Sequence, residues 1–241
     1  MITKIDIYTL LYQRIYSACL TFLLLLIYNT NQELKCAIRH KLKTFNSCNF
    51  KKSMQQIRDN FERMAKLSDE EWNAFSSKLI REEFPKKAAI LKKDHLENYL
   101  SFVEKGLVRY YIPREDSDLT FAFVFDGEFA SGYDSFITRL PAHYNIEALA
   151  DTVLWRISYN DLQDIYAETK IGNTIGRLAS ESLFLKKTKR ELSLLNDSAE
   201  QRYRNLFIEQ PQLIQKIPQK YLASYIGITP QALSRIRKRI Y

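Results

Sequence analysis

The C-terminal stretch from Gln219 to Arg239 constrains the fold of this chain more than any other segment. Two short helices that cross steeply around a tight turn need a small residue at the crossing and a residue that accepts positive φ in the turn. Ala223 and Gly227 meet these needs at the right spacing, and Thr229 can cap a second helix whose first residue is Pro230. The pattern therefore predicts a helix-turn-helix. Its shared core is expected to hold Leu222, Ile226, Ile228, Leu233 and Ile236.

The second helix of this pair would expose a polar and basic face. Arg forms a bidentate pair with guanine and Gln with adenine, and the first residues of a recognition helix lie nearest the base edges. Gln231 and Arg235 are therefore the expected base readers. A helix start and flanking cations suit phosphate instead. The remaining DNA contacts are expected from Thr229, Ser234, Lys238, Arg239 and Lys220, with Arg237 beside them.

Charge is distributed unevenly along the 241 residues, whose 36 Lys and Arg and 28 Asp and Glu give a net +8. Residues 1–53 carry 8 basic and 2 acidic residues, and residues 198–241 carry 8 and 2 again, so each segment has net +6. Residues 54–197 carry 20 basic and 24 acidic residues, which is net −4. The basic segment around the helix-turn-helix favours DNA as a partner.

The first 53 residues differ from the rest of the chain. They hold all three cysteines (Cys19, Cys36 and Cys48) and an apolar stretch from Ile15 to Tyr28 that is short for a membrane span. Three interpretations stay open: a gene read too long with the true start at Met54, a packed or membrane-associated helix, and a cleaved signal.

The segment between residues 69 and 157 combines one helix with several strands. Ser68-Asp69-Glu70-Glu71 is a capping box, which predicts a helix over residues 69–80. After that helix, short runs rich in β-branched and aromatic residues alternate with Gly and Asp turn signals, as in an all-β roll. The clearest strands are Leu100–Glu104, Leu107–Ile112, Leu119–Phe125 and Thr152–Ile157.

Four phenylalanines, Phe121, Phe123, Phe125 and Phe129, occupy odd-numbered positions in this region. Residues two apart in a strand point to the same face. We expect these rings to form one buried face of the core rather than a cage around a ligand.

Helical periodicity returns after Asp161 and predicts a helix from about residue 168 to residue 195, about 42 Å long. Positions spaced alternately four and three residues apart form a coiled-coil-like seam. A long helix with a single stripe favours pairing with a second copy of itself, and packing on its own domain is the alternative. Lys189 continues the spacing and weakens the seam there. The seam residues are Ile171, Ile175, Leu178, Ser182 and Leu185.

Asn196-Asp197 ends that helix, and Ser198-Ala199-Glu200-Gln201 is a second capping box. It predicts a helix to about Glu209 that Pro211 closes. The chain is thus expected to be of the α+β class. Its expected parts are an uncertain extension (1–53), a β-roll (54–160), a dimerisation helix (161–197) and a helix-turn-helix domain (198–241).

This order of β-roll, long dimer helix and C-terminal helix-turn-helix resembles the Crp/Fnr family of bacterial transcription regulators. The resemblance covers residues 54–241 and rests on Lys105–Tyr110, Ser198–Tyr203 and Ile217–Ile240. The last two stretches look most like the Bacteroidetes branch, often called cyclic-nucleotide-binding-domain regulators. The resemblance implies a cyclic-nucleotide-binding-like jelly roll and a homodimer that binds a pseudo-palindromic site on double-stranded DNA.

Arg235 falls on the base-reading arginine of the family, which agrees with the role expected from its position in the helix. Pro230 and Gln231 stand where many members carry Arg and Glu. The resemblance therefore implies DNA recognition without specifying the operator sequence.

Family members hold a cyclic nucleotide with a Gly-Glu pair at the ribose and a later Arg-Ser pair at the phosphate. By position, Gly132 replaces that glutamate and Ala142 that arginine, although a buried phosphate needs a cation. The resemblance thus implies a degenerate effector roll, with Arg139 as a substitute cation if a cyclic nucleotide or another effector still binds. The residues expected around this region are Glu128, Ser131, Tyr133, Arg139 and His143.

Several function classes conflict with the composition. A jelly-roll metal enzyme needs several His with a carboxylate, and only His95 and His143 follow residue 53. An iron–sulfur cluster needs about four cysteines, and residues 54–241 have none. We therefore expect no enzyme activity, metal or cofactor. The expected partners are DNA and a second copy, with RNA polymerase as a further candidate, in the cytoplasm unless residues 15–28 anchor a membrane-tethered form.

Overall fold

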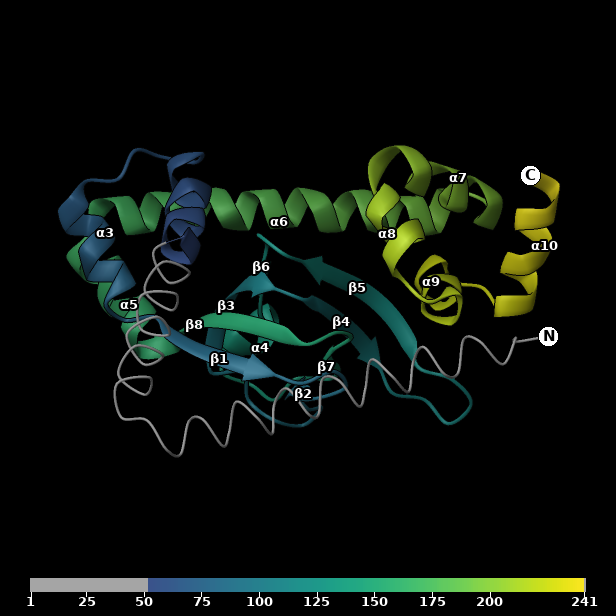
Figure 1. Cartoon of the computed structure of the whole chain (residues 1–241), viewed down its shortest axis with the longest axis horizontal. Coiled ribbons are helices and arrows are strands. Elements are labelled where there is room, and N and C mark those ends of the chain that lie inside the picture. Colours follow the sequence, from purple (N-terminus) through teal and green to yellow (C-terminus); the bar gives the residue numbers. More distant parts are fainter. Residues whose placement is uncertain (1–51, 241) are drawn as a thin grey trace, which may run out of the picture. The chain divides into compact units, whose positions relative to one another are not determined.

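In the computed structural model, residues 52–240 are described. The expectations for the apolar stretch 15–28 and for the cysteines fall outside this range. Within residues 52–240, no helix is both long and apolar enough to cross a membrane. From Gln55 onward the chain forms one compact unit, which contains a roll of two sheets and a series of helices (Figure 1).

The predicted β-roll is present, and it consists of two four-stranded antiparallel sheets. The first sheet has the order β1 (Ile80–Phe84), β8 (Thr152–Ser158), β3 (Tyr99–Lys105) and β6 (Phe129–Ala130). The second has the order β2 (Ala89–Leu91), β7 (Asn145–Ala148), β4 (Leu107–Ile112) and β5 (Leu119–Phe125). The core of the roll includes Leu91, Val103, Val108, Tyr110, Val124, Ala130, Ala142, Ile146 and Leu154.

Strand β5 is buried on both faces, so the expectation of a single buried phenylalanine face is wrong. A β-bulge in its pairing with β4 takes Phe121 out of register. The Phe121 ring therefore packs against Tyr110 and Tyr144, with ring centroids 5.8 and 5.0 Å away. Phe123 and Phe125 join a different core, which β5 shares with the C-terminal helices. These rings are core residues, as expected, but they divide between two cores.

Helix α3 (Asp69–Ser76) begins with the predicted capping box. Ser68 Oγ accepts the backbone N–H of Glu71 at 3.2 Å, and the Ser68 backbone N–H donates to the Glu71 carboxylate at 3.0 Å. The helix is shorter than predicted because Ile80 already pairs in strand β1. Its Phe75 packs edge-on against Phe61 of the helical residues 52–62, at 4.7 Å between centroids.

The predicted long helix is present as α6 (Lys170–Asn196), preceded by α4 (Tyr133–Thr138) and α5 (Tyr159–Glu168). Thr169 separates α5 from α6, and its Oγ1 caps α6 by accepting the Gly172 N–H at 3.1 Å. Gly176 lets α5 pack closely, because a Cβ there would lie 2.8 Å from the Tyr166 hydroxyl oxygen.

The C-terminal part consists of α7 (Ala199–Glu209), α8 (Pro211–Lys216), α9 (Gln219–Ile226) and α10 (Pro230–Ile240). Ser198 caps α7, but the Gln201 side chain donates to Asn205 and does not return to Ser198, so the second capping box is only half formed. Pro211 follows the end of α7, as predicted, and also begins α8.

The turn between α9 and α10 has the local geometry that its residues predicted. Gly227 adopts φ 79°, a left-handed conformation that costs glycine little. Thr229 Oγ1 accepts the Ala232 N–H at 3.2 Å, and Pro230 is the first residue of α10. These contacts fix where α10 starts.

A second core joins the C-terminal helices to strand β5, on which α9 packs. The rings of Phe123 and Tyr225 meet here, with centroids 5.4 Å apart. Apolar burial of this kind supplies most of the free energy that holds such a joint together. Its buried residues are Leu107, Phe123, Phe125, Tyr203, Leu206, Leu213, Ile217, Leu222, Ala223, Tyr225, Ile226, Leu233 and Ile236.

Two turn glycines of the roll allow a matched stability test. Gly106 has φ 126°, and a Cβ on it would lie 2.3 Å from Thr152 Oγ1. Gly127 has φ 83° with nothing within 4 Å of such a Cβ. We expect Gly106→Ala to lower the free energy of unfolding by about 3 kcal/mol through clash and strain, and Gly127→Ala by about 1 kcal/mol through strain alone. Urea denaturation measures both, and equal losses would contradict the role of the clash.

Candidate nucleic-acid interface and ligand region

Helix α10 has one apolar and one polar face. Leu233 and Ile236 are buried in the second core. On the other face the predicted base readers Gln231 and Arg235 are exposed. Ser234 and Lys238 are exposed beside them. The folded chain therefore leaves this face accessible to an anionic ligand.

The cations among the predicted DNA contacts divide into two groups. Arg239 pairs with Glu200 of α7 at 3.2 Å, so its charge is partly compensated within the chain. Within residues 52–240, Arg235 and Lys238 form no ion pair. Lys220 is exposed on α9, with its Nζ 4.6 Å from the Tyr221 ring centroid. Arg235 and Lys238 therefore keep their full charge for a partner.

Arg109 is a buried cation that the sequence patterns did not single out as functional, and its side chain is only 2% exposed. Its guanidinium pairs with Glu147 at 2.7 Å and Asp118 at 3.0 Å. It also donates from Nε to Thr120 Oγ1 at 2.9 Å. The ring of Tyr221 on α9 lies 3.9 Å from its guanidinium carbon. Arg109 thus connects strand β4 with helix α9. The sequence signal that could have identified Arg109 is an arginine within an apolar strand.

Ser224 forms a second polar contact between α9 and β5. Its hydroxyl oxygen accepts the Thr120 N–H at 2.8 Å, and its O–H donates to the Asp118 carbonyl at 2.8 Å. One side chain therefore satisfies both backbone groups at the start of the strand. Both partners are more than 100 positions away, so no local pattern predicts the contact.

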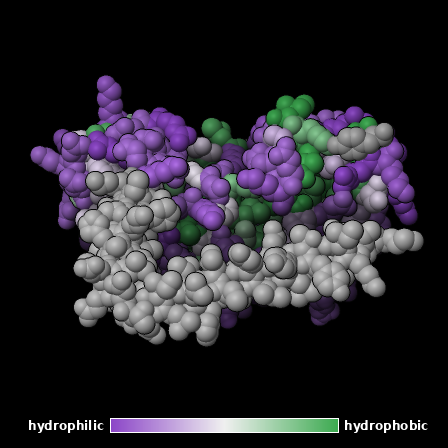
Figure 2. All heavy atoms as spheres, viewed as in Figure 1, coloured by the Kyte–Doolittle hydropathy of each residue, from purple (hydrophilic) through white to green (hydrophobic). Residues whose placement is uncertain are grey.

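The predicted seam residues of α6 differ in how far they are buried within the chain. Ile175 is buried within its own chain, and Ile171 and Leu178 are partly buried. Leu185 is 67% exposed, and Ser182 is exposed as well. The N-terminal seam positions therefore contribute to intramolecular packing, and the apolar surface left open lies further along the helix. Figure 2 shows hydrophobic surface in that middle part of α6. The other exposed apolar residues of α6 are Phe184, Leu192, Leu194 and Leu195.

Two of the predicted ligand-region residues contact α6 instead of facing a ligand. The Glu128 carboxylate lies 3.5 Å from Lys186 Nζ and accepts the Phe125 N–H at 2.9 Å. The Tyr133 hydroxyl lies 3.0 Å from Ser180 Oγ. Both residues therefore tie the roll to its long helix.

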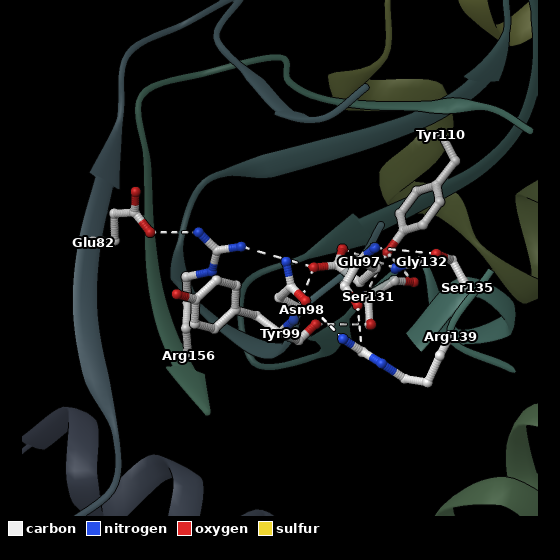
Figure 3. A network of polar contacts seen from close by, with 10 residues as sticks. All are labelled: Glu82, Glu97, Asn98, Tyr99, Tyr110, Ser131, Gly132, Ser135, Arg139 and Arg156. Carbon is white, nitrogen blue, oxygen red and sulfur yellow. Dashed lines mark hydrogen bonds and ion pairs between the residues drawn. The ribbon is translucent and has the colours of Figure 1, made fainter. Parts of the chain in front are cut away.

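Ser131 is held inside the roll. Its N–H donates to the Tyr110 hydroxyl at 2.9 Å, and its own hydroxyl donates to the Tyr99 carbonyl at 2.9 Å (Figure 3). Burial raises the pKa of the Tyr110 phenol well above its usual range. This hydroxyl therefore stays protonated and able to donate at any physiological pH.

Arg139, the predicted substitute cation, is engaged within the chain. Its guanidinium donates to the Glu97 carbonyl at 2.9 Å and to Asn98 Oδ1 at 2.7 Å (Figure 3). The same group lies 4.3 Å from the Tyr159 ring centroid. A phosphate would have to displace these contacts before Arg139 could bind it.

Glu97 is a buried acid that sequence reasoning missed, and it is 3% exposed. Its carboxylate accepts the Tyr99 N–H at 2.9 Å and the Gly132 N–H at 3.2 Å, and Arg156 Nη2 lies 3.9 Å away (Figure 3). Burial raises the pKa of this carboxyl, and the two N–H groups and the Arg156 charge oppose the rise. Arg156 also pairs with Glu82. Acid and cation thus compensate each other inside the roll.

The two positions that replace the family's ligand residues are closed. Ala142 is fully buried, and a Cβ on Gly132 would lie 2.6 Å from Leu91 Cδ2. His143, the remaining predicted residue, is exposed. Of the five predicted residues, Glu128 and Tyr133 contact α6, Ser131 and Arg139 bond within the roll, and His143 is exposed. Among residues 52–240 the structure also holds no cluster of three His, Cys, Asp or Glu side chains suited to a metal ion.

Comparison with known proteins agrees with this architecture. Residues 81–169 match the family described as Cyclic nucleotide-binding domain. No curated protein matches the chain. The roll is therefore similar to the domains that this family describes.

Solved structures of Crp/Fnr family regulators share the fold. A mutant of CooA from Carboxydothermus hydrogenoformans has a TM-score of 0.57 at 18% identity, over 73% of this chain and 87% of that one. FixK2 from Bradyrhizobium japonicum has a TM-score of 0.57 at 17% identity, over 67% of this chain and 84% of that one. The c-di-GMP responsive regulator CLP from Xanthomonas campestris has a TM-score of 0.55 at 18% identity, over 72% of this chain and 91% of that one. The chain is similar in fold to these regulators.

Proposed function

We propose that this protein is a dimeric, sequence-specific DNA-binding transcription regulator of the Crp/Fnr type, of the Bacteroidetes-like branch. The observation that carries the proposal is the two-faced helix α10, which follows the tight Gly227 turn with its polar face exposed and its apolar face buried. We interpret α9 and α10 as a helix-turn-helix with α10 as the recognition helix. The name of one structural neighbour, CLP, describes a global regulator linked to gene expression.

Within this proposal the exposed residues of α10 have separate tasks. Arg235 and Gln231 read base edges, because they lie in the first half of the helix. Lys238 and Lys220 contact phosphates, which adds affinity without sequence preference. Thr229 has its hydroxyl oxygen occupied by the Ala232 N–H, so it contacts phosphate by donating its O–H.

Arg235→Ala tests the reading role. We expect it to weaken binding to duplexes from the protein's own promoter region about tenfold to a hundredfold, because a bidentate pair with guanine is lost. Lys238→Ala should weaken all sequences alike and reduce the salt dependence by about one counterion. Fluorescence anisotropy at several salt concentrations measures both.

Arg63→Ala is the matched control for this experiment. Arg63 is exposed, and within residues 52–240 its side chain donates only to the Asp59 carbonyl of its own helical segment. Its replacement by alanine removes the same charge as Arg235→Ala. The Arg63→Ala variant should bind DNA as the wild type does. If the wild type binds the duplexes no more tightly than Arg235→Ala does, even at low salt, the proposal that Arg235 reads DNA is contradicted.

We further propose that α6 forms the dimer contact. Leu185 lies within the exposed apolar part of the helix, and Leu192 and Leu195 continue it toward the C-terminal end. Arg190 contacts the roll strand β5, so the opposite side of the helix is the one available to a second copy. This contact centres on Leu185 and extends past Lys189, which pairs with Glu209 of α7 at 2.9 Å.

Leu185→Asp is expected to dissociate the dimer, because it would bury an unpaired charge at the seam. Sedimentation velocity of the wild type should give twice the chain mass of 28.5 kDa, and the variant should sediment as a single chain. Ile80→Asp is the matched control, since Ile80 is 57% exposed on strand β1 and should stay dimeric. A wild-type monomer at micromolar concentration would contradict the proposal.

The effector roll is proposed to be degenerate. Its cations Arg139 and Arg156 bond to groups of the roll itself. Ala142 is fully buried, and a side chain at Gly132 would have to displace Leu91. The alternative, a roll that still senses a cyclic nucleotide, is favoured by the family match over residues 81–169. RNA polymerase as a partner and a cytoplasmic location remain parts of the proposal.

Calorimetry with cyclic AMP, cyclic GMP and cyclic di-GMP separates these two possibilities. We expect no heat of binding, because a buried phosphate without a free cation loses its hydration uncompensated. A dissociation constant in the micromolar range for any of the three nucleotides would instead establish the sensing alternative.

A further inference from the structure

The C-terminal end of helix α9 is bonded by two arginines from other helices. The last four carbonyls of a helix lack partners within it. The Gly227 N–H bonds back to the Ala223 and Ser224 carbonyls. The next two carbonyls accept hydrogen bonds from side chains. The Tyr225 carbonyl accepts one from Arg190 of α6, and the Ile226 carbonyl accepts one from Arg202 of α7 at 2.9 Å. Both cations also suit the negative end of the helix dipole.

Arg190 reaches a third element with the same guanidinium. Its Nε donates to the Phe121 carbonyl of strand β5 at 3.2 Å, while its Nη2 donates to the Tyr225 carbonyl. The guanidinium carbon lies 3.6 Å from the Tyr225 ring centroid. One side chain therefore joins α6, β5 and α9, and its planar fork suits two carbonyls at once.

The Arg190 charge is held by carbonyl dipoles and by the face of the Tyr225 ring. Among residues 52–240 it forms no ion pair. Burial lowers its pKa, and the charge of Arg202 acts in the same direction. A buried cation is costly unless its donors are satisfied, so its position depends on the two carbonyls staying in place.

The bonded carbonyls lie immediately before the recognition helix. Only Gly227, Ile228 and Thr229 separate α9 from α10. A displacement of the Tyr225 carbonyl would therefore move the start of α10 with it. In a dimer built on α6, the distance between two such starts sets the half-site spacing on DNA.

We propose that Arg190 is a positioning residue that fixes recognition helix α10 relative to dimer helix α6 and thereby determines which half-site spacing the protein accepts. This inference rests on the proposed DNA-binding function and adds to it a residue that never touches DNA. Arg109 and Ser224 hold the N-terminal and middle parts of α9, whereas Arg190 bonds its C-terminal end directly from α6. Arg202 of α7 bonds the same end to the Asp197 carbonyl at the C-cap of α6, but it does not contact strand β5 through a hydrogen bond among residues 52–240.

The first experiment needs no DNA. Amide hydrogen exchange is measured on the full-length wild type and on Arg190→Met, which keeps an unbranched apolar stem and removes the fork. Exchange over residues 225–232 should accelerate about tenfold, as expected when hydrogen bonds from a charged donor are lost. Exchange in strands β3 and β8 should be unchanged, which verifies that the variant folds. Arg190→Lys, which keeps the charge but not the fork, should fall between the two.

Lys187→Met is the matched control on the same helix. Lys187 is exposed and faces the same strand, with its Nζ 5.9 Å from the Phe121 ring centroid. The substitution removes the same charge, and within residues 52–240 the Lys187 side chain forms no hydrogen bond or ion pair that would be lost. Exchange of this variant over residues 225–232 should equal that of the wild type.

The second experiment measures spacing. A duplex selected by the wild type from a random library is remade with one to three base pairs added or removed between its half-sites. We expect the wild type to lose at least about tenfold in affinity for each altered duplex, because one base pair also rotates a half-site around the helix axis. Arg190→Met should discriminate less than about threefold, and Lys187→Met should behave as the wild type.

The outcomes separate the two levels of the argument. Accelerated exchange together with a flattened spacing profile supports the positioning role. Unchanged exchange, or wild-type spacing discrimination in Arg190→Met, overturns it while DNA binding stands. A wild type that selects no duplex overturns the proposed function itself, and the positioning role falls with it even if exchange accelerates.

Discussion

The burial of helix α9 against the outer face of strand β5 is the contact on which the rest of the C-terminal arrangement depends. Apolar rings such as Phe123 and Tyr225 supply most of its free energy, because burial of apolar area is the dominant favourable contribution to folding. Polar contacts at Arg109, Ser224 and Arg190 then fix the register, since a shifted helix would leave their donors buried without acceptors. Helix α10 follows α9 by a short turn and takes its position from this joint.

The roll has the architecture of a ligand-binding domain, but Glu97 and Arg139 within it bond to other groups of the roll. Glu97 accepts the Tyr99 N–H of β3 and the Gly132 N–H just before α4 and lies beside Arg156, while Arg139 bonds to the carbonyl of Glu97 itself. Each of these groups would need a new partner if a phosphate entered. Tyr133, the first residue of α4, bonds to Ser180 of α6. In our account the roll therefore acts as a rigid support that connects the dimer helix to the DNA-binding helices.

The sequence predicted those features that local rules control. Capping at Ser68, the Gly227 turn and the start of α10 at Pro230 depend on neighbouring residues, and hydrophobic periodicity predicted the long helix. Features that depend on distant partners were missed: Ser224 bonds a strand more than 100 positions away, and Phe121 changes face at a bulge set by strand pairing. The intramolecular partners of Glu128, Tyr133 and Arg139 in the expected ligand region are distant in sequence as well.

Selection of duplexes from a random library by the full-length protein, followed by hydroxyl-radical footprinting of the selected sequences, tests the central claim most directly. A dimer that reads DNA with α10 should select one pseudo-palindromic element. It should protect two half-sites centred about 10 base pairs apart, or a multiple of that distance, on one face of the duplex. Selected duplexes with no twofold-symmetric element, or protection that is independent of sequence, would contradict the account.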